Sequence, residues 1–175
     1  DLVNGEIPGW IEETGTAWTK APAETAQFPV TIEGSTYFFP GDTAIGELRQ
    51  DIDVSAFAAG IEAGTQQFDL SAYLRSANES PADVPELLIE FLDAGKTQLL
   101  GALSSGPTPS PSAWTPILGN LVPPPGTVWI RLRLMATRNT GTTNDAYFDG
   151  LSLRPHANAA AQLNGTVTDD GLPEG

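Results

Sequence analysis

The chain has 175 residues, a formal net charge of −14, 18 glycines, 15 prolines and no cysteine. A surface this acidic repels nucleic acid and anionic membranes, so we expect neither as a partner. Without cysteine, the chain can form no disulfide, no thiol nucleophile and no cysteine-ligated zinc site. No run of about 18 apolar residues occurs, so the sequence predicts no membrane-spanning helix.

Short apolar segments separated by turn signals follow one another through the first 154 residues. In chain order they predict strands at 2–7, 16–19, 31–32, 36–39, 44–54, 65–76, 86–92, 97–103, 114–121, 127–137 and 145–153. Residues 55–64 are rich in alanine and predict a short connection of about one helical turn. Because long helical periodicity is missing and turn signals recur, we expect an all-β antiparallel sandwich.

Two of these strands carry very different side chains on their two faces. Residues i and i+2 of a strand share a face, so strict alternation separates the two sets. In the 127–137 strand, one face carries Val128, Ile130, Leu132, Leu134 and Ala136, and the other carries Trp129, Arg131 and Arg133. In the 65–76 strand, Tyr73 and Arg75 lie opposite the apolar set. The apolar sets predict faces that are buried in the core, and the aromatic and basic sets predict an outer face that can bind a ligand.

Three phrases resemble strands of the galactose-binding-like jelly rolls, a group that includes many carbohydrate-binding modules. They are LVNGEIPGW at residues 2–10, LRQDIDV at 48–54 and AYFDGLSL at 146–153, which are similar to the opening, an internal and the closing strand of that group. The resemblance implies an antiparallel two-sheet jelly-roll sandwich over residues 1–154. It does not by itself imply a ligand, because the group contains sugar binders, protein binders and spacers.

Residues 155–175 predict a linker and the first strand of a following module. QLNGTVTDDGLPEG, at residues 162–175, resembles the beginning of the polycystic-kidney-disease-type immunoglobulin-like repeats found in large bacterial surface proteins. We therefore expect this chain to be one binding module of a larger secreted or cell-surface protein.

The resemblance implies that the 65–76 and 127–137 strands are neighbours in one sheet, which would gather their polar side chains on one open face. The candidate ligand-binding residues are Tyr73, Arg75, Glu90, Trp129, Arg131 and Arg133. Aromatic rings stack on the C–H groups of a sugar, and arginine and glutamate bind its hydroxyls, so we favour a carbohydrate or glycan as partner. Two alternatives stay open. The arginines can instead pair with Asp51, Asp69 or Glu90 in a cross-strand ladder, or a ligand can bind at the loops that carry Trp10, Trp18 and Trp114.

A structural calcium ion is the second implication of the resemblance, because in this family an ion often sits where the first and last strands meet. Asp149 matches the acidic position of the closing strand, and Glu6 lies in the matching part of the opening strand. Calcium takes six to eight oxygen ligands, which suits carboxylates together with backbone carbonyls. The alternative is that Asp149 only caps a turn through hydrogen bonds to the backbone.

Catalysis is not expected. His156 is the only histidine and follows the last predicted strand, where it is poorly placed for a Ser-His-Asp triad. The favoured function is therefore non-catalytic carbohydrate binding. The leading alternative is a structural or adhesive module that docks a partner protein or a neighbouring domain without binding sugar, and a hydrolase ranks last.

Overall fold

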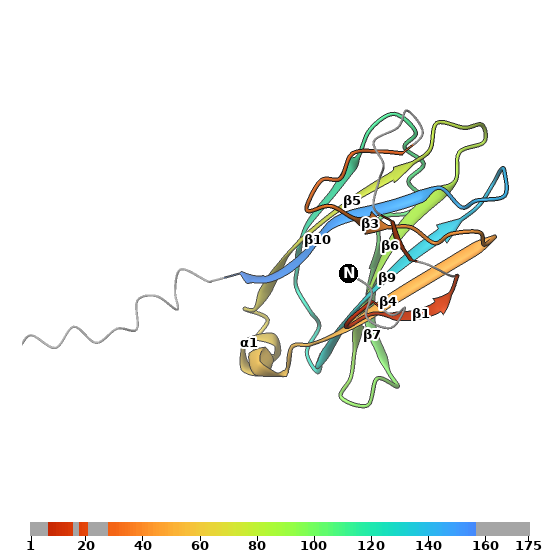
Figure 1. The fold of residues 1–175 in the computed structure, drawn as a ribbon. Coiled ribbons are helices and arrows are strands. Elements are labelled where there is room, and N and C mark those ends of the chain that lie inside the picture. The colour runs from red at the N-terminus through yellow and green to blue at the C-terminus, as the bar shows by residue number, and fades with distance from the viewer. Residues whose placement is uncertain (1–6, 16–17, 21–27, 157–175) are drawn as a thin grey trace, which may run out of the picture.

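The protein is a sandwich of two five-stranded antiparallel sheets, seen in a computed structural model that describes residues 7–15, 18–20 and 28–156 (Figure 1). The first sheet, here called the β9 sheet, has the order β1 (Ile11–Thr14), β4 (Ile45–Asp53), β9 (Trp129–Thr137), β6 (Val84–Leu92) and β7 (Leu99–Ser104). The second, the β10 sheet, has the order β2 (Thr19–Lys20), β3 (Tyr37–Phe38), β10 (Ala146–His156), β5 (Gln67–Ser76) and β8 (Thr115–Leu121). The predicted antiparallel jelly-roll sandwich is confirmed.

A short helical connection links β4 of one sheet to β5 of the other. It consists of one 3₁₀ turn, η1 (Ser55–Phe57), and the helix α1 (Ala58–Glu62), which agrees with the predicted single helical turn. Neither this helix nor any other in the described ranges is long and apolar enough to cross a membrane.

Alternating side chains of the central strands form the core between the two sheets. Leu48, Ile130 and Leu134 enter it from the β9 sheet and are fully buried. Leu74 and Phe148 enter from the β10 sheet and are also fully buried. The period-two pattern of these strands thus reflects a sheet that packs one face into the core and exposes the other face to water.

The strand predictions fail where alternation is absent. The strand β1 was not predicted because all four of its residues are exposed and no face of it is apolar. Residues 31–32, predicted as a strand, form a bend instead, in which the Thr31 hydroxyl donates to the Gly34 carbonyl at 2.9 Å. Most of the predicted 2–7 strand and all of the resemblance at 162–175 lie outside the described residues.

The prediction that the 65–76 and 127–137 strands are neighbours is wrong. The strand β9 pairs with β4 on one side and β6 on the other, whereas β5 pairs with β10 and β8. Their polar faces therefore lie on opposite outer surfaces of the sandwich. Tyr73 and Arg75 are on one surface, and Trp129, Arg131, Arg133 and Glu90 are on the other.

Candidate functional site

The outer face of the β9 sheet carries a ladder of ion pairs centred on Asp51. Arg131, from the neighbouring strand, donates two hydrogen bonds to Asp51, at 2.5 and 3.0 Å. Arg49 and Lys96 each donate one more to the same carboxylate, at 2.9 Å. Burial opposes the charge of Asp51, but the hydrogen bonds from Arg131 and Lys96 outweigh it and hold the pKa of Asp51 well below its usual range.

The other predicted residues of this face are paired in the same way. Arg133 donates from Nε to Glu90 at 2.8 Å and also bonds Glu47 through Nη1. The Lys96 ammonium lies 3.8 Å from the centre of the Trp129 ring, and the Trp129 indole donates to the Ala94 carbonyl at 3.3 Å. The cross-strand ladder that the sequence left open is therefore the arrangement of Arg131 and Arg133, with Asp51 and Glu90 among their acidic partners.

A groove of about 550 Å³ crosses the outer face of the β10 sheet. Its lining comes from β5, β10 and the bend before β3, and comprises Ile32, Glu33, Asp69, Leu70, Ser71, Tyr73, Gly150, Ser152 and Arg154. Of the predicted ligand-binding residues, only Tyr73 lines this groove. Arg75 lies further along β5, opposite Tyr147 in the sheet, and its Nε is buried without a hydrogen-bond partner among the described residues.

A β-bulge in β10 positions Tyr73 in the groove. The pairing of β10 with β5 shifts register between Asp149 and Ser152, and Gly150 within the bulge has a φ of +57°. A Cβ atom at Gly150 would lie 2.8 Å from the Tyr73 ring, so the ring rests directly on the glycine backbone. Glycine is needed here both for the left-handed conformation and for this close approach.

The polar side chains of the groove make fewer ion pairs than those of the ladder. Arg154 donates from Nε to the Ser152 hydroxyl at 3.0 Å, and it makes no ion pair with any described residue. Asp69 accepts a hydrogen bond from the Asn120 amide at 3.0 Å and lies 3.0 Å from Nδ1 of His156. The groove thus combines the Tyr73 ring with a guanidinium that makes no ion pair with a described residue and with an exposed carboxylate.

Asp149 fastens the bend that forms one wall of the groove. Its carboxylate is almost fully buried and accepts the backbone N–H groups of Ile32 at 2.6 Å, Glu33 at 3.3 Å and Gly150 at 2.7 Å. This is the turn-capping role that the sequence left open. Glu6, the other predicted calcium ligand, lies outside the described residues.

The tryptophans near the loops differ in what they can contact. Trp18 is fully buried in the core and donates to the Thr14 carbonyl at 2.9 Å, so it cannot touch a ligand. Trp114 packs edge-on against Tyr37 and donates to the Val30 carbonyl at 2.8 Å. Trp10 lines a second hollow of about 350 Å³ at the sandwich edge, beside Phe38.

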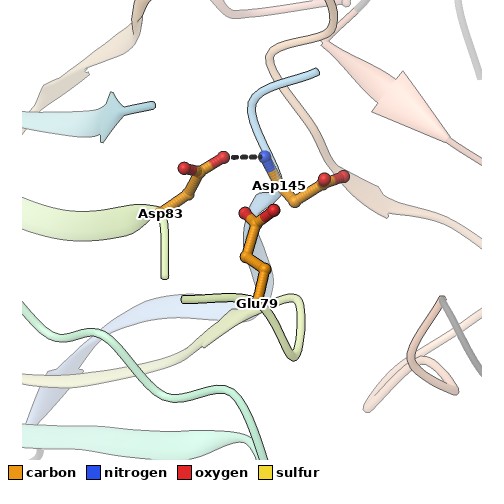
Figure 2. Close-up of side chains that lie close together, drawn as sticks. All are labelled: Glu79, Asp83 and Asp145. Carbon is orange, nitrogen blue, oxygen red and sulfur yellow. Dashed lines mark hydrogen bonds between the residues drawn. The ribbon is translucent and has the colours of Figure 1, made fainter. Parts of the chain in front are cut away.

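A group of three acids was missed by the sequence analysis. Oxygens of Glu79, Asp83 and Asp145 all lie within 4.8 Å of one another (Figure 2). Glu79 and Asp83 come from the loop between β5 and β6, and Asp145 immediately precedes β10. Because two loops supply them and the chain has 22 acids, no spacing in the sequence singles them out.

The three acids could hold a metal ion, and their environment is unusual for carboxylates. Asp83 is fully buried and accepts backbone N–H groups from Asn139 at 2.6 Å, Thr140 at 3.2 Å and Asp145 at 2.7 Å. Burial, followed by the charges of Asp83 and Asp145, raises the pKa of Glu79 to about 7. The group holds a surplus of negative charge in a site that water solvates poorly.

Neither a family model nor a curated protein matches this sequence. Among solved structures, the enzymatically active domain of tailspike protein 4 from bacteriophage CBA120 is similar with a TM-score of 0.60 and 14% identity, over 89% of this chain and 21% of that one. The chain therefore spans about a fifth of the tailspike chain.

Two carbohydrate-binding structures are similar over most of this chain. The module TmCBM61, in complex with β-1,4-galactotriose, has a TM-score of 0.56 and 12% identity over 87% of this chain and 92% of that one. The CBM22-1 and GH10 modules of Clostridium thermocellum xylanase 10B, in complex with xylohexaose, have a TM-score of 0.52 and 15% identity over 86% of this chain and 26% of that one. The chain has the β-sandwich fold of carbohydrate-binding modules. At these identities, the likeness establishes the fold alone.

Proposed function

We propose that this chain is a non-catalytic carbohydrate-binding module and that the groove on the outer face of the β10 sheet holds the sugar. The observation that carries the proposal is the composition of that groove: the Tyr73 ring lies in one hollow with Arg154 and Asp69. A sugar needs an aromatic surface for its C–H groups and charged groups for its hydroxyls, and the groove offers both. The similar fold of TmCBM61, whose structure is a complex with β-1,4-galactotriose, supports the proposal.

The groove is a better candidate than the ladder because Arg154, unlike Arg131 and Arg133, makes no ion pair with a described residue. A sugar on the β9 sheet would have to compete with Asp51 for Arg131, and with Lys96 for the face of Trp129. In the groove, Tyr73 is already held in place by Gly150, so little side-chain entropy is lost on binding.

The charge of the groove favours a neutral sugar. Among the described residues that line it, Arg154 is the one that is basic, whereas Asp69 and Glu33 are both acidic. A uronic acid or a sulfated sugar would meet two carboxylates for each guanidinium, in a chain with a net charge of −14. A volume of about 550 Å³ suits a short segment of a neutral glycan.

Glycan-array binding of the full chain, followed by titration of the best glycan, tests the proposal. Tyr73→Ala is expected to weaken binding about tenfold or more, because the stacking surface is lost. The matched control is Trp129→Ala, an aromatic truncation on the opposite face, which is expected to leave affinity unchanged. Loss of binding only in Trp129→Ala would move the site to the ladder, and absence of any glycan ligand would refute the function.

The wider proposal keeps the setting that the family resemblance implies: one module of a larger secreted or cell-surface protein, with a structural calcium ion. An ion bound only by the folded state stabilises that state by mass action. Asp149 keeps lone pairs beyond its three backbone hydrogen bonds, so a calcium ligand at this position is compatible with the observed cap.

A docking module is the second candidate, and exposed apolar residues on the edge strands favour it. Leu99 and Leu103 of β7 are 55% and 48% exposed, and Leu118 of β8 is 69% exposed. Such residues on edge strands suit contact with a neighbouring protein domain. A complex with a neighbouring domain that resists competing sugars, and that is lost in Leu118→Ser, would support docking over glycan binding.

A further inference from the structure

The three acids lie where the two sheets of the sandwich are joined by loops. Asp83 immediately precedes β6 of the β9 sheet, and Asp145 immediately precedes β10 of the other sheet. Figure 2 shows the Glu79 side chain rising from its loop toward the space between the two aspartates. Oxygens within 4.8 Å of one another can share a single coordination sphere, because calcium binds oxygen at 2.3–2.6 Å.

Hydrogen bonds engage Asp83 and Asp145, whereas one carboxylate oxygen of Glu79 has no partner among the described residues. Three backbone N–H groups partly offset the charge of Asp83, and the Tyr147 hydroxyl donates to Asp145 at 2.9 Å. Oε1 of Glu79, in contrast, is buried and has no hydrogen-bond partner among the described residues. Bringing three such carboxylates together is unfavourable unless a cation or a proton accompanies them.

A second, independent feature beside the acids is the hydroxyl of Tyr37. Tyr37 is only 2% exposed, and its hydroxyl is buried with no hydrogen-bond partner in the described part of the chain. The Tyr37 ring lies 5.1 Å from the ring of Tyr147, whose own hydroxyl binds Asp145. Tyr37 therefore belongs to the same buried cluster as Tyr147, the residue that contacts Asp145.

We propose that Glu79, Asp83 and Asp145 bind a calcium ion, and that a water molecule on the ion satisfies the buried hydroxyl of Tyr37. The donors are all oxygens, without histidine or cysteine, which selects a hard cation. Calcium fits better than magnesium, because oxygens spread over as much as 4.8 Å suit its longer and more variable bonds. The ion ties the β5–β6 loop to the start of β10 and so fastens one sheet to the other. This site is separate from the position of Asp149 and does not depend on sugar binding.

Thermal unfolding of the full chain with chelator, with calcium and with magnesium is the first test. Calcium at a hundredfold excess over its Kd is expected to raise the Tm by about 5–10 °C above that in chelator, and magnesium by less. Glu79→Gln keeps the side-chain volume and removes the charge, so most of the shift is expected to disappear. Glu12→Gln, the same kind of charge removal at an exposed acid of β1, is the matched control and is expected to keep the shift.

Terbium luminescence sensitised by nearby tyrosines is the second test and does not depend on stability. Terbium is expected to bind the wild type, to be displaced by calcium, and to lose its sensitised signal in Glu79→Gln while keeping it in Glu12→Gln. The proposal is overturned if Glu79→Gln retains both the Tm shift and the signal. It is equally overturned if the wild type responds to neither ion, since a shared proton then suffices for the three acids. Failure of either kind leaves the glycan proposal intact.

Discussion

Gly150 is the residue on which the shape of the groove depends. It allows the bulge in β10 by adopting a φ of +57°, and it leaves room for the Tyr73 ring, which a Cβ atom would approach to 2.8 Å. Asp149, immediately before it, holds the bend of Ile32 and Glu33 at the groove wall. Two adjacent residues thus place both the aromatic surface and one wall of the candidate site.

Gly150→Ala is expected to destabilise the protein by about 2–4 kcal/mol, because the left-handed backbone cost adds to a clash with Tyr73. It should also weaken glycan binding, since the ring must move. The measurement is urea unfolding together with the glycan titration.

Gly34→Ala separates the two causes. Gly34 has a similar φ of +65°, but a Cβ atom there meets nothing within 4 Å. Only the backbone cost of about 1 kcal/mol is expected, with glycan affinity unchanged. Equal losses of stability in the two variants would show that the contact with Tyr73 is not important.

At the scale of elements, ion pairs on the outer face of the β9 sheet join the strands β4, β9 and β6, in addition to the backbone hydrogen bonds between them. Asp51 of β4 lies opposite Arg131 of β9, which in turn lies opposite Glu90 of β6. Opposite charges at directly paired positions stabilise a sheet and oppose slippage of its register. We therefore assign Arg131 and Arg133 to the stability of this sheet.

The acid stability of the protein is expected to depend on Asp51. The pKa of Asp51 in the folded state is held below the unfolded value of about 3.9. Its contribution to the free energy of unfolding is therefore fully present above that pH, and it is lost as the pH falls toward the lower folded pKa. Asp51→Asn is expected to cost about 1–3 kcal/mol at pH 7 and progressively less below about pH 4. Urea unfolding as a function of pH measures both effects.

Glu12→Gln is the control for this prediction. Glu12 lies in the adjacent strand β1 and is exposed, so the loss of its charge should change the unfolding free energy by less than about 0.5 kcal/mol. If Asp51→Asn retained the full pH dependence of the wild type, the ladder would not be the source of acid sensitivity.

The whole molecule is held together by the core between the sheets, to which both β9 and β10 contribute. Leu134 of β9 is fully buried there, whereas Leu118 of β8 is 69% exposed. Leu134→Ala is expected to lower the unfolding free energy by about 2–5 kcal/mol, and Leu118→Ala by no more than about 0.5 kcal/mol. Chemical denaturation of this matched pair checks the assignment of inner and outer faces, and similar losses in both would contradict it.

The alternation of Ile130, Leu132 and Leu134 against Trp129, Arg131 and Arg133 was enough to predict strands, their buried faces and a sandwich, because period-two burial is a local property of each strand. Strand β1 escaped prediction because its four exposed residues carry no such signal. The phrase around Asp149 predicted a calcium ligand there, which stays a prediction, whereas the hydrogen bonds of Asp149 to the backbone of residues 32 and 33 involve a bend far away in the sequence.

Which faces share a surface depends on strand order, and strand order is set by pairing between segments far apart in the chain. Tyr73 and Trp129 each lie on a polar strand face, yet β5 and β9 belong to different sheets, so the two rings point away from each other. The groove at Gly150 and the meeting of Glu79 with Asp145 likewise arise only when distant loops and strands come together. Local pattern therefore established what each strand is, and long-range packing established which side chains can act together.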